Sequence, residues 1–92
     1  LALFSHVEAT RAQNREAAGK LNAELVRHFK AGQFARARAV GERAVAATEI
    51  AYGANHANLA AALNNLALVH TKLANFDDAE GYQRRVLAAR SK

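Results

Sequence analysis

The 92-residue sequence contains no cysteine, no proline, no methionine and no tryptophan. Without cysteine it has no disulfide framework and no thiolate metal site, so the redox compartment is undetermined and the cytoplasm is the default expectation. No apolar run approaches the roughly 20 residues that a membrane-spanning helix needs, so we expect no membrane partner. Because position 1 is not methionine either, we expect a chain that was processed or cut from a longer one.

The lack of proline, together with 24 alanines, strongly favours helices that pack closely. Glycine is also scarce, and Gly32 and Gly53 fall between periodic segments, where they predict turns. A chain of this size buries only roughly 60–65% of its unfolded surface. We therefore expect an all-α protein with a thin core.

The formal net charge is +5, but opposite charges are interspersed along the whole chain. This distribution is typical of solvated helix surfaces. Arg36, Arg38 and Arg43 form a small basic patch on one predicted helix. No aromatic platform accompanies the patch and no nucleic-acid recognition motif is present, so we do not expect nucleic acid as a partner.

The sequence carries no recognisable catalytic or metal-binding motif. His28 and His70 are 42 residues apart, and they recur because a longer unit recurs, so we interpret them as packing residues. Asp77 and Asp78 indicate the start of a helix and not an acid–base pair. With no nucleophile motif, no phosphate-binding loop and no HExxH, we predict no enzyme activity, no metal and no cofactor.

The chain repeats itself at an offset of 42 residues, where 21–47 aligns with 63–89. The identical pairs include Leu21/Leu63, Asn22/Asn64, His28/His70, Lys30/Lys72, Phe34/Phe76, Ala37/Ala79, Arg43/Arg85, Ala46/Ala88 and Ala47/Ala89. A period between 20 and 50 residues predicts a solenoid of stacked units.

Each unit divides into two helices. In the second unit a stripe with spacings of three and four residues precedes a break at Ala74-Asn75. This stripe comprises Leu59, Leu63, Leu66, His70 and Leu73. Asn75 has the chemistry of an N-cap, and a second apolar stripe follows from Phe76. In the first unit, Gly32 separates the helices and Gly53 ends the second one.

This pattern resembles the tetratricopeptide repeat, in the 42-residue variety found in kinesin light chains. The residues that carry the resemblance are Leu63, Leu66, Ala67, His70, Phe76, Ala79 and Leu87. It covers about residues 17–90, nearly two repeats, and implies antiparallel helical hairpins stacked as a short right-handed solenoid.

The chain departs from the family pattern at several positions. Ala54 and Ala57 replace the usual linker prolines, so the following helix start is less pre-organised. Ala74 replaces a turn glycine, which costs about 1 kcal/mol if the turn requires a positive φ. Gly41 and Gln83 stand where an aromatic residue is usual, so we expect thinner packing between repeats.

The first helix of each unit has a second face that points away from the leucine stripe. At about 100° per residue, this face mixes apolar side chains, amides and lysines. The resemblance implies that this face lines a concave groove that binds peptides, with Asn65 at a position that bonds a peptide backbone. The candidate groove residues are Asn22, Val26, Phe29, Lys30, Asn64, Asn65, Leu68 and Lys72.

The N-terminal segment leaves alternatives open. SHVE (5–8) has the spacing of a capping box, which indicates a helix start at Ser5. This helix either continues into the first repeat or belongs to a preceding repeat or cap. We therefore expect residues 1–16 to form an N-terminal helical segment or cap, 17–54 the first repeat and 55–92 the second.

The function predicted from these features is a non-catalytic protein–protein interaction module that binds a peptide segment of a partner protein. The alternative is a structural or self-associating segment. Two repeats are fewer than the roughly three usually needed for stability, and no polar helix follows Arg90 to cover the last hairpin. We therefore expect the isolated chain to be unstable or to form a homo-oligomer, a dimer in the simplest case.

Overall fold

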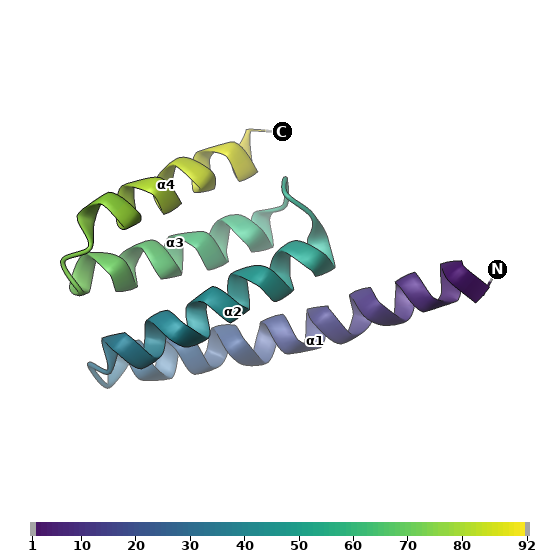
Figure 1. The fold of residues 1–92 in the computed structure, drawn as a ribbon, viewed down its shortest axis with the longest axis horizontal. Coiled ribbons are helices and arrows are strands. Elements are labelled where there is room, and N and C mark those ends of the chain that lie inside the picture. The colour runs from purple at the N-terminus through teal and green to yellow at the C-terminus, as the bar shows by residue number, and fades with distance from the viewer. Residues whose placement is uncertain (1, 92) are drawn as a thin grey trace.

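The computed structural model describes the backbone of residues 2–91 and the side chains from His6 to Ser91. Within these residues, four α-helices follow one another: α1 (Ala2–Lys30), α2 (Phe34–Tyr52), α3 (Ala57–Lys72) and α4 (Phe76–Arg90). Figure 1 shows that neighbouring helices run antiparallel, so α1 and α3 are parallel to each other. The all-α expectation of two helical hairpins is confirmed.

The helix α1 is longer than its partner α2 and extends past the end of it (Figure 1). The N-terminal segment and the first helix of the first repeat thus form one continuous helix. The prediction of a helix start at Ser5 is wrong, because α1 already begins at Ala2. The side chain of Ser5 lies outside the described residues.

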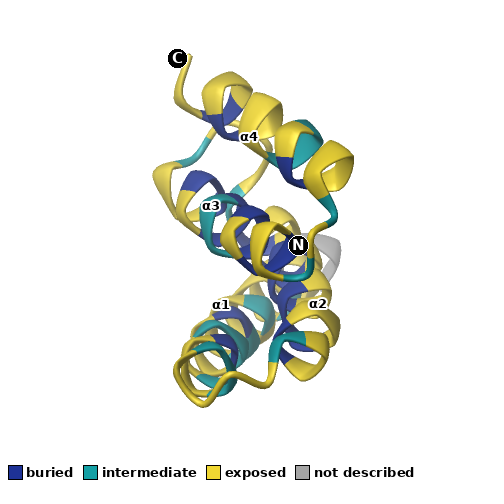
Figure 2. Ribbon diagram, turned by 90° about the vertical axis from the view of Figure 1, so that its left-hand side faces the viewer, coloured by how far each residue is buried: buried dark blue, intermediate teal, exposed yellow. Residues whose placement is uncertain are grey.

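The core consists of two apolar clusters that meet along α2 and α3. One joins α2, α3 and α4 through Val45, Leu59, Leu63, Leu66 and Val86. The other joins α1, α2 and α3 through Leu25, Ala37, Val40 and Val69. The buried residues face the interior between the helices, while the outer faces are exposed (Figure 2). The predicted leucine stripe of 59–70 is therefore the buried side of α3.

Both hairpin turns use the same backbone geometry. In the first, the amide of Gln33 donates to the carbonyl of His28 and that of Gly32 to Phe29. The second repeats these bonds 42 residues later, from Asn75 to His70 and from Ala74 to Thr71. This pair of bonds is the Schellman motif, which requires a left-handed residue after the helix.

The left-handed residue is Gly32 in the first turn, with φ of 74°, and Ala74 in the second, with φ of 62°. The expectation that an alanine occupies a strained turn position is therefore confirmed. Gly53 also has a positive φ, 87°, and ends α2 as predicted.

Asn75 occupies the N-cap position of α4, as predicted, but its side chain does not make the capping hydrogen bond expected there. Its amide instead lies 3.3 Å from His70 Nδ1. The Schellman turn brings these two residues together, so the side chain bonds backwards to the preceding helix and not forwards to α4.

Candidate functional site

The parallel helices α1 and α3 enclose a cleft with two adjacent pockets. The first, here called the apolar pocket, measures about 270 Å³ and is lined by Leu25, Val26, Phe29, Lys30, Asn65 and Leu68. The second, the polar pocket, measures about 280 Å³ and has the polar lining residues Arg15, Asn22, Thr48, Tyr52, Asn58 and Asn65. Asn65 lines both pockets, so they are neighbours in one continuous groove.

The apolar pocket exposes large hydrophobic side chains. Val26 is 37% exposed and Leu68 is 46% exposed, and each lies four residues before the end of its helix. Phe29 is half-buried and packs edge-on against Phe34, with ring centroids 5.4 Å apart. Leu25, which is fully buried, forms the floor. Apolar side chains held open to water in a concave surface are typical of ligand-binding sites.

The predicted groove residues divide between the two pockets. Val26, Phe29, Lys30 and Leu68 line the apolar pocket. Asn22 lines the polar pocket, and Asn65 lies at the junction. Their helical spacing brings these six side chains to one groove from two different helices.

Two further predicted residues do not line either pocket. Asn64 is turned toward α4, where its Oδ1 accepts a hydrogen bond from Gln83 Nε2 at 3.2 Å. Lys72, in the last turn of α3, is exposed. The adjacent asparagines of α3 thus lie in different environments, since only Asn65 lines the groove.

Four polar lining residues of the polar pocket were not among the predicted site residues: Arg15, Thr48, Tyr52 and Asn58. Two of them were detectable, because Arg15 and Asn58 continue the groove faces of α1 and α3 toward their N-termini at helical spacing. Thr48 and Tyr52 come from α2, and no sequence pattern indicates that the end of α2 reaches this groove.

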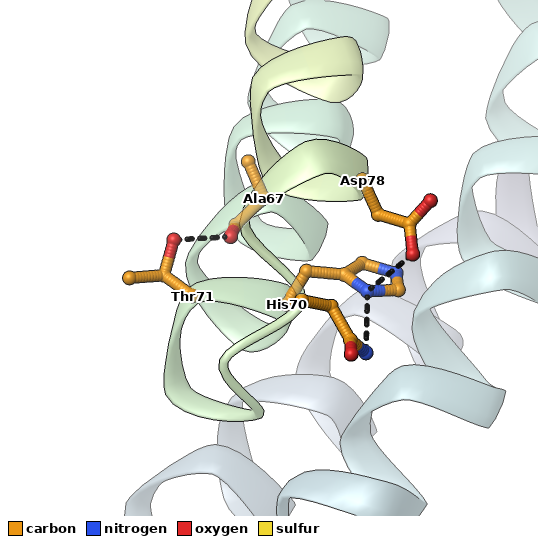
Figure 3. Close-up of polar contacts among 5 residues, drawn as sticks. Ala67, His70, Thr71 and Asp78 are labelled. Atoms are coloured by element: carbon orange, nitrogen blue, oxygen red, sulfur yellow. Dashed lines mark hydrogen bonds and ion pairs between the residues drawn. The ribbon is translucent and has the colours of Figure 1, made fainter.

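The repeated histidines pack as predicted, though to different depths. His70 is buried and stacks on the Tyr82 ring, with centroids 5.2 Å apart. Its Nδ1 lies 4.0 Å from Asp78 Oδ2. Figure 3 shows this contact as a dashed line. His28 is half-buried, and its Nδ1 lies 2.8 Å from Gln33 Oε1. Among residues 2–91, no group of three or more histidine, aspartate or glutamate side chains has a metal-binding arrangement.

Comparison with known families agrees with this architecture. The tetratricopeptide repeat family matches residues 26–92, which is most of the chain. The chain belongs to the tetratricopeptide repeat family. No curated protein and no solved structure matches it significantly.

Tetratricopeptide repeats are in general non-catalytic. The family suggests, for this chain, the broad class of protein–protein interaction modules. None of its described helices is both long enough and apolar enough to cross a bilayer. In this tetratricopeptide protein, the groove between α1 and α3 is lined by the first helix of each hairpin, together with Thr48 and Tyr52 of α2.

Proposed function

We propose that this protein binds an extended peptide segment of a partner protein in the groove between α1 and α3. The observation that carries the proposal is the apolar pocket, where Val26, Phe29 and Leu68 remain accessible to solvent beside the amide of Asn65. Burial of such side chains by a ligand is favourable at about 25 cal/mol per Å² of apolar surface.

The groove also carries the polar groups that an extended peptide requires. A peptide backbone has unpaired N–H and C=O groups, which must keep hydrogen bonds when they leave water. The side-chain amide of Asn65 donates and accepts, so it can bond both groups of one peptide residue. Lys30 at the pocket edge, with Lys72 farther along α3, favours a ligand that carries negative charge.

Selection from a phage-displayed library of random peptides, followed by calorimetric titration of a selected peptide, tests this function. The double variant Asn65→Ala/Leu68→Glu removes the amide and places a charge in the apolar pocket. We expect it to lose the peptide while keeping its helicity, because Leu68 is already half-exposed and takes no part in the core.

Leu87→Glu provides the matched control, since it introduces the same charge at an exposed leucine of α4, away from the groove. It should leave peptide affinity unchanged. Peptides that bind the double variant as well as the unaltered protein would contradict the groove proposal.

A second candidate function, self-association, is favoured by the outer face of α4. Leu87 is 70% exposed and Phe76 is 64% exposed. The residue 42 positions before Leu87 is Val45, which α3 covers so that only 6% is exposed. These two exposed side chains of α4 are of the kind that a neighbouring hairpin would cover.

Gel filtration with light scattering distinguishes this candidate. If the α4 face mediates self-association, the protein is a dimer at concentrations on the order of tens of micromolar, and Leu87→Glu converts it to a monomer while Leu68→Glu does not. A folded monomer at these concentrations contradicts self-association and leaves peptide binding unaffected.

A further inference from the structure

The last helix, α4, carries a shallow depression on its own surface, away from the groove between α1 and α3. This helix lies at one edge of the molecule, with α3 on its inner side (Figure 1). The depression measures about 310 Å³, and all the residues that line it belong to α4: Asp77, Asp78, Gly81, Tyr82 and Arg85. It is therefore a feature of one helix surface and not a cleft between two helices.

Gly81 lies in the middle of this stretch of α4. Glycine in the interior of a helix is destabilising relative to alanine, so its presence calls for a packing reason. A Cβ built at Gly81 would have nothing within 4 Å, whereas one built at Gly41 would meet the side chains of neighbouring helices. Packing within the chain thus does not require glycine at position 81, but the close approach of a second backbone would.

The charges around Gly81 are arranged symmetrically. Asp77 and Asp78 lie four and three residues before it, and Arg84 and Arg85 lie three and four residues after it. All four side chains are exposed. At about 100° per residue, each lies within about 60° of Gly81 around the helix axis, so the four share its face. A face that is acidic on one side of its midpoint and basic on the other is complementary to an antiparallel copy of itself.

The helix dipole explains only part of this arrangement. Acidic residues in the first turn of α4 interact favourably with the dipole, and so does Arg90 in the last turn. Arg84 and Arg85 precede the last turn, and the effect of the dipole falls off within one turn of the helix end. Their position therefore needs another reason.

The repeat pattern does not impose the acidic pair either. In α2 the residues equivalent to Asp77 and Asp78 are Ala35 and Arg36, and the residue equivalent to Gly81 is Ala39. The glycine and the two carboxylates are thus particular to α4.

Contacts within the chain leave these charges available to a partner. Arg84 Nη1 lies 2.7 Å from Glu80 Oε1, and Arg85 Nη2 lies 3.5 Å from Glu49 Oε1. Both pairs are exposed to solvent, where an ion pair contributes little to stability. Asp77 forms no ion pair with any other described residue. A second molecule can therefore engage these side chains without breaking a buried interaction.

We infer that two copies of this protein associate through α4, with the two helices antiparallel and crossing at Gly81. Asp77 of one copy pairs with Arg85 of the other, and Asp78 pairs with Arg84. Because the contact has two-fold symmetry, each ion pair occurs twice.

This contact goes beyond the proposed peptide binding, and it differs from the second candidate function in the side of α4 that it uses. Leu87 is six residues after Gly81, which places it about 120° away around the helix. Phe76 is five residues before Gly81 and lies about 140° away.

Sedimentation equilibrium of the unaltered protein is the first measurement. A contact between one pair of helices falls in the small interface class, below about 1,200 Å² in total, so we expect weak association. The protein should pass from monomer to dimer between about 10 μM and about 1 mM. Added salt should raise the dissociation constant, because the ion pairs are exposed.

Gly81→Gln separates the contact from the stability of the fold. Glutamine is a better helix former than glycine, and the added side chain meets nothing within 4 Å at its Cβ, so the melting temperature of the monomer should rise. The same side chain keeps the two helices apart, so the dissociation constant of the dimer should increase at least about tenfold. Gly19→Gln is the matched control, since a Cβ at this glycine of α1 is equally unobstructed. It should leave association unchanged.

Charge reversal tests the pairing of the helices. One variant carries Asp77→Arg and Asp78→Arg, and the other carries Arg84→Asp and Arg85→Asp. Each should remain a monomer by itself, because like charges then face each other across the contact. An equimolar mixture should form a heterodimer, since the opposite charges are restored. Circular dichroism establishes that both variants are folded, and if either is not, Gly81→Gln decides the matter alone.

The contrary outcomes are distinct. A protein that stays monomeric up to about 1 mM overturns the inference, and so does a dimer that Gly81→Gln leaves intact. Folded charge-reversal variants that do not associate when mixed also overturn it. A dimer that Leu87→Glu abolishes and Gly81→Gln preserves supports the second candidate function instead. The peptide-binding proposal is judged separately, by the variant Asn65→Ala/Leu68→Glu.

Discussion

The two hairpins are built from nearly the same sequence pattern, yet equivalent positions differ sharply in environment. The turns are alike: the same backbone hydrogen bonds close both, and the left-handed residue is Gly32 in one and Ala74 in the other. In both, a side chain immediately after the turn contacts the histidine five residues before it, Gln33 with His28 and Asn75 with His70. Local geometry is thus repeated in detail.

Packing is not repeated. Gly41 of α2 is buried against α3, and a Cβ built there would lie 2.8 Å from Cδ1 of both Leu25 and Leu66. Its equivalent in α4, Gln83, is exposed and bonds to Asn64. Hydrogen-bonded turns depend on a few neighbouring residues, whereas burial depends on the next hairpin. The first hairpin is covered on its α2 side and the second is open on its α4 side.

The largest expected difference concerns the leucines at positions 21 and 63. Leu63 is fully buried in the cluster of α2, α3 and α4, whereas Leu21 is half-buried against the other cluster. Leu63→Ala should lower the free energy of unfolding by about 3 kcal/mol, and Leu21→Ala by roughly half as much. Urea denaturation followed by circular dichroism measures both. Equal losses would mean that the two hairpins contribute equally to the core.

The next difference concerns Gly41 and Gln83. Gly41→Leu inserts a side chain into the contact among α1, α2 and α3, so we expect a loss of about 2 kcal/mol despite the higher helix propensity of leucine. Gln83→Leu places the same side chain on the open face of α4 and should change stability by less than about 0.5 kcal/mol. A tolerated leucine at position 41 would show that the packing between repeats is loose. The same denaturation assay applies.

The sequence predicted the elements that depend on short-range patterns. Hydrophobic period and turn chemistry are local properties of the sequence. They were therefore enough to predict the hairpins, the buried leucine side of α3 and the helix ends at Gly32 and Gly53. The family match bears out the repeat interpretation. The N-terminal boundary was missed because the capping-box spacing of SHVE recurs by chance within a continuing helix, here α1.

The candidate site was only partly predictable, because it is formed by three helices. Helical spacing identified the groove-facing residues Val26, Phe29 and Leu68, which line the apolar pocket. It could not separate Asn64 from Asn65, since that depends on where α4 lies. Nor could it bring Tyr52 of α2 beside Arg15 of α1, because the relative position of these residues follows from hairpin packing.

Exchange of the turn residues tests whether the two turns are equivalent. Both positions have positive φ, a region where glycine is unstrained and alanine is not. Ala74→Gly should therefore stabilise the protein by about 1 kcal/mol, and Gly32→Ala should destabilise it by a similar amount. A change of the same sign in both variants would contradict the equivalence of the turns. Thermal unfolding measures both shifts.

The smallest expected effect concerns positions 40 and 82, where buried Val40 in α2 corresponds to half-buried Tyr82 in α4. Burial raises the pKa of the Tyr82 phenol above 10.0, and the charges of Glu42 and Asp78 act in the same direction against the opposing effect of Arg85. The folded protein thus holds this proton more tightly than the unfolded chain. The resulting stabilisation is fully present below pH 10.0 and is lost as the pH rises through the folded pKa.

The measurement is the urea midpoint at pH values on both sides of 10.0. As the pH rises, the midpoint should fall more steeply for the unaltered protein than for Tyr82→Phe, since phenylalanine has no proton to lose. If the urea midpoints of the two proteins fell equally with pH, the phenol of Tyr82 would be as hydrated in the folded state as in the unfolded state. The open α4 side of the second hairpin would then account for that hydration.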